Sequence, residues 1–210
     1  MVIIGLGSAG INIANKFKKW PQYRVILPSM KTYETVEEQE EKTVAMIKLY
    51  GPVSEEKSEE TIEHMLKYTY TGGDLIQFII STHGGLVSEM FSVYDIMRLC
   101  REDCTIATLG IGKVMSAGVL LLAAGTKGSR QIGENCQIMI HGLKAEQGGY
   151  LPAMENDLEN LNQLQERYIK VLSKETNMSK RYIKKLFNRK LDVYLTAEEA
   201  VEFGIADEII

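Results

Sequence analysis

The chain has few cysteines, no block rich in lysine and arginine, and no long hydrophobic run. Three cysteines give an odd count without a Cys-x-x-Cys pair, which excludes a disulfide framework and a zinc site as leading hypotheses. A formal net charge of -4 without a basic stripe argues against nucleic acid as the main partner. No stretch approaches the roughly 20 apolar residues of a membrane span, and the first ten residues lack the pattern of a secretory signal. We therefore expect a cytoplasmic protein that binds no membrane and no metal.

The 210 residues are enough for one domain with a substantial core, and 45% of them are hydrophobic. From residue 42 onward, short apolar runs alternate with segments of helical periodicity, which predicts an α/β layer architecture. The expected strands are 43–49, 75–80, 105–109 and 137–140, and the expected helices are 55–70, 86–100 and 152–176. The apolar stripe of the last helix could pack within its own domain or against a neighbouring subunit.

The first forty residues form a different pattern. Gly5, Gly7 and Gly10 spell Gly-x-Gly-x-x-Gly after an expected strand at 1–6, and a second strand is expected at 23–27. The segment resembles the first phosphate loop of nucleotide-binding folds such as the tubulin/FtsZ family, but no acidic residue follows the second strand to hold a ribose. We therefore divide the chain into an N-terminal extension, 1–41, and a domain, 42–210. The extension either resembles a nucleotide-binding loop or is a docking or gating segment.

Ser116 is the first candidate for catalysis. It lies between Gly112 and Gly118, after an apolar stretch and before the apolar run 119–124, which predicts a strand, a tight turn and a buried helix. A serine hydroxyl is a poor nucleophile at neutral pH, so it needs a nearby base and free N–H groups for the developing oxyanion. The N–H of Ala117, in the first turn of the expected helix, is a candidate donor. Serine is also common in turns and helix caps, so this motif alone is weak.

His141 follows about 25 residues later, at the end of the apolar strand 138–140. Its side chain is suited to proton transfer when a partner is present. A single histidine in this position is more often structural than catalytic. Ser116 and His141 together nevertheless make a hydrolase the first hypothesis.

Four segments carry a family resemblance when they are taken in order. Gly84 and Gly85 after a strand, 112–118, 139–141 and 192–207 resemble the proteolytic subunit of the Clp protease in residues and spacing, over about 42–210. The resemblance implies the spiral of repeated β-β-α units shared with the crotonase fold, with a protruding long helix. The functional residues that it implies are the nucleophile Ser116, the general base His141, the orienting carboxylate Asp192, and the oxyanion-hole N–H groups of Gly85 and Ala117.

The resemblance also implies an assembly. Family members stack two heptameric rings around enclosed active sites, and the long helix, preceded by a strand like 147–150, joins the rings. An AAA+ ATPase unfolds substrate proteins and threads them into the chamber. The protease chain itself then binds no ATP and needs no cofactor, and its substrates are unfolded proteins and peptides.

The chain departs from the family pattern at several positions. Gln77 and Ile79 replace two tyrosines of the partner-docking pocket, His83 replaces a common proline, and Leu191 replaces an arginine that often couples ring association to activity. These departures keep a second hypothesis open, a non-catalytic structural or regulatory subunit of a mixed ring. A third hypothesis, an acyl-CoA enzyme of the crotonase class, would require a carboxylate near the oxyanion amides, where this chain has serine and histidine.

Overall fold

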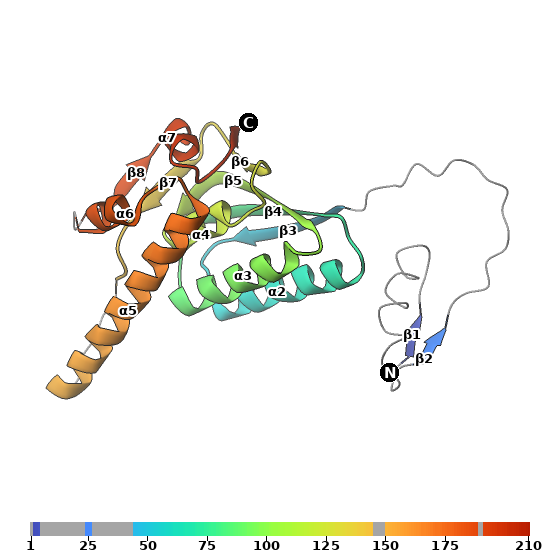
Figure 1. The fold of residues 1–210 in the computed structure, drawn as a ribbon, viewed down its shortest axis with the longest axis horizontal. Coiled ribbons are helices and arrows are strands. Elements are labelled where there is room, and N and C mark those ends of the chain that lie inside the picture. The colour runs from blue at the N-terminus through green and yellow to red at the C-terminus, as the bar shows by residue number, and fades with distance from the viewer. Residues whose placement is uncertain (1, 5–23, 27–43, 145–149, 189–190) are drawn as a thin grey trace.

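Parallel strand pairing organises the chain (Figure 1). The computed structural model describes residues 2–4, 24–26, 44–144, 150–188 and 191–210. In this part of the chain a seven-stranded sheet has the order β3-β4-β5-β6-β9, with β7 paired to β5 and β8 paired to β7. Its strands are β3 Val44–Tyr50, β4 Leu75–Thr82, β5 Thr105–Met115, β6 Arg130–Ile132, β7 Gln137–Ile140, β8 Val193–Leu195 and β9 Glu208–Ile209. Only the β7–β8 pair is antiparallel, so the predicted α/β class is confirmed.

Two short strands near the N-terminus form a separate pair. Strands β1 (Val2–Ile4) and β2 (Arg24–Ile26) are parallel, and they fall within the strands expected at 1–6 and 23–27. The Gly-x-Gly-x-x-Gly motif and the expected helix behind it lie outside the described residues. The division between an N-terminal extension and a main domain stays a prediction.

The helices confirm the periodicity of the sequence and add two that it did not predict. They are α2 Glu55–Tyr70, α3 Val87–Cys100, α4 Ala117–Ala123, α5 Leu151–Glu175, α6 Lys180–Phe187 and α7 Ala197–Glu202. The Ser54 hydroxyl caps α2 by accepting from the N–H of Lys57, and Thr196 forms a reciprocal capping box with Glu199 at α7. Helices α6 and α7 are short, which explains why their periodicity gave no prediction. No helix among the described residues is long and apolar enough to cross a membrane.

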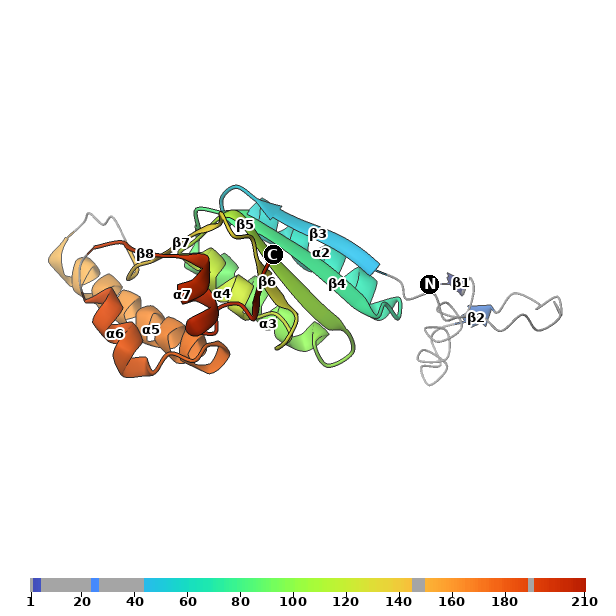
Figure 2. The same cartoon turned by 90° about the horizontal axis from the view of Figure 1, so that it is seen from above.

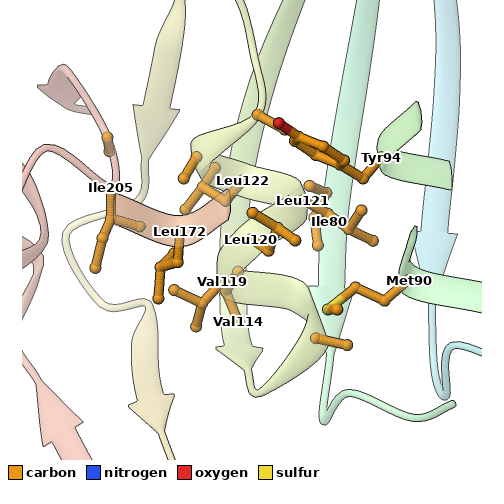
Figure 3. Packing of buried hydrophobic residues seen from close by; sticks show 14 of the residues in the cluster. Ile80, Met90, Tyr94, Val114, Val119, Leu120, Leu121, Leu122, Leu172 and Ile205 are labelled. Carbon is orange, nitrogen blue, oxygen red and sulfur yellow. The ribbon is translucent and has the colours of Figure 1, made fainter. Parts of the chain in front are cut away.

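The core lies between the sheet and the helices on one of its faces. Helices α2 and α3 lie side by side (Figure 1), and α3 and α4 lie on the same side of the sheet (Figure 2). Every residue of α4 is buried, and this helix contacts α3 and α5. Side chains of α4 interlock with those of β4, β5, α3 and α5 (Figure 3). Each fully buried leucine of α4 contributes about 1.5–3 kcal/mol to stability. This burial fixes the helix that follows Ser116.

Helix α5 is embedded along only half of its length. Its C-terminal half buries Tyr168, Ile169 and Leu172 in the core, whereas Leu151 and Leu158 in its N-terminal half are exposed. Figure 1 shows that this N-terminal half projects away from the rest of the domain. Of the two alternatives that the sequence left open for the apolar stripe, packing within its own domain holds for its second half.

Glu175, at the end of α5, is a buried charge with three hydrogen-bond donors. Its carboxylate accepts from the Tyr94 hydroxyl at 2.8 Å, from Arg98 Nη1 at 3.0 Å and from Arg101 Nη1 at 3.3 Å. Burial alone would raise the pKa of Glu175, but these donors outweigh it and lower the pKa below the ordinary value. Burial, and then the bond to Glu175, raise the pKa of Tyr94 to about 12, so the hydroxyl stays a donor.

We expect Glu175→Gln to lower the free energy of unfolding by about 2–4 kcal/mol, because the arginines lose their charged acceptor. Since the native pKa of Glu175 lies below its unfolded value, its stabilisation is present above about pH 4.5 and is lost as the pH falls through the native pKa. Measured by denaturant unfolding, the free energy of unfolding of the wild type should therefore fall more on acidification than that of Glu175→Gln. Glu59→Gln, at an exposed position on α2, is the control and should change neither value. If acid lowered the stability of wild type and Glu175→Gln equally, the ionised Glu175 carboxylate would not be the source of this stabilisation.

Candidate active site

Ser116 occupies a strained turn between β5 and α4. Its backbone has φ 52° and ψ -116°, and it is the only non-glycine residue with positive φ in the described part of the chain. Such a conformation costs about 1–3 kcal/mol and persists only where the surroundings enforce it. A serine on a strained strand-to-helix turn is also the geometry that exposes the nucleophilic hydroxyl of α/β-hydrolases. The predicted strand, turn and buried helix are confirmed, although β5 runs six residues beyond its expected end.

Gly84 lies directly against the Ser116 side chain. A Cβ atom at Gly84 would be 2.6 Å from Ser116 Cβ and 3.1 Å from Ser116 Oγ, and Gly84 has φ +98°. Its N–H is held by the Thr82 hydroxyl at 2.9 Å. Gly85 is equally restricted, because its Cβ would meet the Val53 carbonyl oxygen at 2.2 Å. Glycine at position 84 thus allows this loop to approach Ser116, and glycine at position 85 allows it to pack against Val53.

Two backbone amides beside Ser116 have no acceptor among the described residues. The neighbours of Gly85 are bonded, since Gly84 carbonyl accepts from Val53 and Leu86 donates to Val53, but the Gly85 N–H makes no hydrogen bond. The Ala117 N–H, at the first position of α4, makes none either. Unpaired amides next to a hydroxyl can bind a developing oxyanion.

The strand register brings the three predicted side chains to one edge of the sheet. Ser116 N–H donates to the Met139 carbonyl at 2.8 Å and continues the parallel β5–β7 ladder, so His141 follows Ser116's own partner by two residues. Strand β8 runs antiparallel to β7 with Val193 opposite Ile140. One further step of that register sets Asp192 opposite His141, where cross-strand neighbours lie about 5 Å apart at Cβ.

The polar atoms of His141 and Asp192 have other partners. His141 Nδ1 is hydrogen-bonded to the Gly142 carbonyl, and Asp192 Oδ1 accepts from Lys144 Nζ at 2.9 Å. The hydrogen bond from Lys144, together with the charges of Lys144 and His141, lowers the pKa of Asp192. In the described part of the chain no hydrogen bond joins Ser116 Oγ to His141, or His141 to Asp192.

Two residues at this site had no role in the sequence interpretation. Tyr168 of α5 was expected only as part of an apolar stripe, but its hydroxyl donates to the Ser116 carbonyl at 3.1 Å. Burial raises the pKa of Tyr168, so the group remains an O–H donor. Lys144 was not considered because it contacts Asp192 across 48 residues of sequence. A tyrosine on an otherwise aliphatic stripe is the one sequence signal that could have suggested a polar contact.

The arrangement offers a hydroxyl, an imidazole, a carboxylate and free amides, which is the set of groups that acyl transfer requires. Among the residues described, no group of three or more histidine, cysteine, aspartate or glutamate side chains could hold a metal ion. Of the positions that depart from the family pattern, His83 and Leu191 are exposed, and the Gln77 amide nitrogen is buried without a partner in the described part of the chain.

Comparison with known proteins gives a consistent result. The family model described as Clp protease matches residues 31–210. The ATP-dependent Clp protease proteolytic subunit 1 of Bifidobacterium longum (strain NCC 2705) is 32% identical over 136 residues. That alignment covers 64% of this chain and 57% of the relative, so it spans less than two thirds of the relative's length.

Gly84→Ala should destabilise the protein by about 1–3 kcal/mol more than Gly72→Ala. Both glycines have positive φ, +98° and +80°, so both substitutions carry the backbone strain. Only at Gly84 does the added methyl collide with Ser116, whereas nothing lies within 4 Å of the Cβ position at Gly72. Denaturant unfolding of the two variants measures the difference. Equal losses of stability would mean that the loop can withdraw from Ser116 without cost.

Proposed function

Since this chain belongs to the Clp protease family, we propose that it is a serine endopeptidase subunit of a self-compartmentalised Clp-type protease. The observation that carries the proposal is the turn at Ser116. Strained backbone of this kind clusters at functional sites. Here it coincides with the close approach of Gly84 and with the amides of Gly85 and Ala117, which have no acceptor among the described residues. Together they provide what an attacking hydroxyl needs.

In the proposed reaction, Ser116 Oγ attacks the carbonyl carbon of a peptide bond. His141 accepts the hydroxyl proton and later gives it to the leaving amine, while Asp192 orients the ring and stabilises the imidazolium. The N–H groups of Gly85 and Ala117 bind the negative oxygen of the tetrahedral intermediate. Water then hydrolyses the acyl-enzyme by the same proton transfers in reverse.

The reaction requires a small rearrangement of two side chains. His141 Nδ1 must exchange the Gly142 carbonyl for an oxygen of the Asp192 carboxylate, whose Oδ1 now accepts from Lys144. Catalytic hydrogen bonds are often long or misaligned until substrate binds, so this geometry is compatible with an active enzyme. His141 and Asp192 directly adjoin the last β7–β8 pair, Ile140 and Val193, so we expect side-chain rotation to bring them together.

The proposed assembly is a pair of stacked heptameric rings, or a mixed ring with related subunits. The exposed apolar side chains of α5, Leu151, Met154 and Leu158, are the surface that we assign to contacts between rings. An AAA+ unfoldase would deliver unfolded proteins, and the chain itself would bind no nucleotide or other cofactor. Three free, buried cysteines are compatible with the proposed cytoplasmic location.

A non-catalytic subunit of a mixed ring is the alternative. The observation that favours it is that His141 and Asp192 are each bonded to other groups. Exposed Leu191, at the position where the family often has arginine, points in the same direction. Such a subunit would assemble normally and would not react with serine-directed reagents.

Ser116→Ala should abolish peptide hydrolysis and lower the rate by several orders of magnitude, while ring assembly persists. We would incubate the assembled wild type with a fluorophosphonate and locate the label by mass spectrometry. Labelling is expected at Ser116, and His141→Ala should prevent it. Ser92→Ala removes an exposed hydroxyl on α3 and should leave labelling unchanged. A well-assembled ring that stays unlabelled would favour the non-catalytic alternative.

Leu158→Glu should reduce the assembled mass measured by analytical ultracentrifugation, because it places a charge in the exposed apolar face of α5. The matched control is Asn156→Glu, which adds the same charge at an exposed position outside that face. We expect circular dichroism to show the same helix content in both variants. If Leu158→Glu assembled like the wild type, the contact between rings would have to lie elsewhere.

A further inference from the structure

Asp192 is paired with Lys144, although strand register sets it opposite His141. Lys144 Nζ donates to Asp192 Oδ1 at 2.9 Å, and it reaches the carboxylate from the segment that follows β7. Lys144 and His141 are the charged groups of the described residues that act on this carboxylate. Lys144 and His141 therefore lie three residues apart in the sequence, and both interact with the Asp192 carboxylate.

The other half of the expected pair is engaged as well. His141 Nδ1, the ring nitrogen that an orienting carboxylate would hold, is bonded to the carbonyl of its own neighbour Gly142. That bond is local and can form whenever Asp192 is occupied. In this arrangement the ammonium group of Lys144, and not the imidazole of His141, is the hydrogen-bond partner of the Asp192 carboxylate.

The ion pair is exposed enough to exchange. The side chain of Lys144 is 68% exposed and that of Asp192 is 35% exposed. Exposed ion pairs contribute little to the free energy of folding, and salt weakens them further, because water and counterions compete for both charges. Lys144 can therefore compete with His141 without preventing its access to Asp192 permanently.

We propose that Lys144 is a positioning residue that restrains the peptidase by competing with His141 for the Asp192 carboxylate. The inference rests on the proposed function. While Lys144 holds Asp192, the carboxylate does not hydrogen-bond the imidazole, and the ammonium charge weakens its stabilisation of the imidazolium. A negatively charged group that captures the Lys144 ammonium would release Asp192 to His141.

Lys144→Gln is the test, carried out on the full chain in its assembled form. We expect the second-order rate of fluorophosphonate labelling at Ser116, and kcat/KM for a short peptide, to rise about two- to fivefold, the factor that an exposed ion pair is worth. Lys144→Arg keeps the charge and the bond to Asp192, and it should keep the wild-type rate. Lys57→Gln, which breaks the exposed Lys57–Glu60 pair on α2, is the matched control and should also leave the rate unchanged.

The pH profile separates competition from a structural role. In Lys144→Gln the released carboxylate stabilises the imidazolium, so the acidic limb of kcat/KM should move to higher pH relative to wild type and Lys144→Arg. An unchanged limb together with an unchanged or lower rate would overturn the inference.

Failure of the inference is distinguishable from failure of the proposed function. A wild type that is labelled at Ser116, at the same rate as Lys144→Gln, would refute the role of Lys144 and leave the peptidase standing. A wild type and a Lys144→Gln variant that both stay unlabelled would refute both.

Discussion

The hydrogen bond from Ser116 N–H to the Met139 carbonyl is the contact on which the candidate site depends. It continues the β5–β7 ladder beyond the last paired residue of β5. Because the ladder ends there, Ser116 leaves the strand at a fixed point, and His141 follows at the end of the neighbouring strand. If this register slipped by one residue, every side chain would change face and the two residues would no longer lie at one edge.

The strain at Ser116 is tolerated because both sides of the turn are held. Behind it, all seven residues of α4 are buried, and their burial far outweighs the roughly 1–3 kcal/mol that the backbone conformation costs. The Tyr168 hydroxyl of α5, 52 residues further along the chain, donates a hydrogen bond to the Ser116 carbonyl. The turn is therefore a product of the whole core rather than of its local sequence.

Much of the fold could be predicted because its long elements are strongly periodic. Strand β7 has the expected bounds, and α2, α3 and α5 agree with prediction to within one residue at their ends. Strands β6, β8 and β9 were missed because two or three residues cannot display a period. The end of β5 was misplaced because Gly110 and Gly112 resemble a turn, whereas the strand continues through both.

The residues of the candidate site were identified from the order and spacing of sequence motifs, and their catalytic roles stay predictions. Sequence order could not reveal the Lys144–Asp192 pair or the Tyr168–Ser116 bond, because each joins positions 48 or 52 residues apart. Such contacts depend on the register of β7 against β8 and on the rotation of α5 about its axis. Neither quantity is encoded in a local pattern of residue types.

The uninterrupted course of α5 has a mechanical consequence. Between Pro152 and Glu175 the helix contains neither proline nor glycine, the usual causes of kinks, so it behaves as a stiff rod. Leu151, at its tip, lies about 25 Å along the rod from Tyr168, at a rise of about 1.5 Å per residue. A tilt of about 5° around the embedded half would displace the tip by about 2 Å and hardly move the tyrosine. The outer half of α5 can thus shift by small amounts without displacing the Tyr168 hydroxyl, which donates to the Ser116 carbonyl near the centre of the tilt.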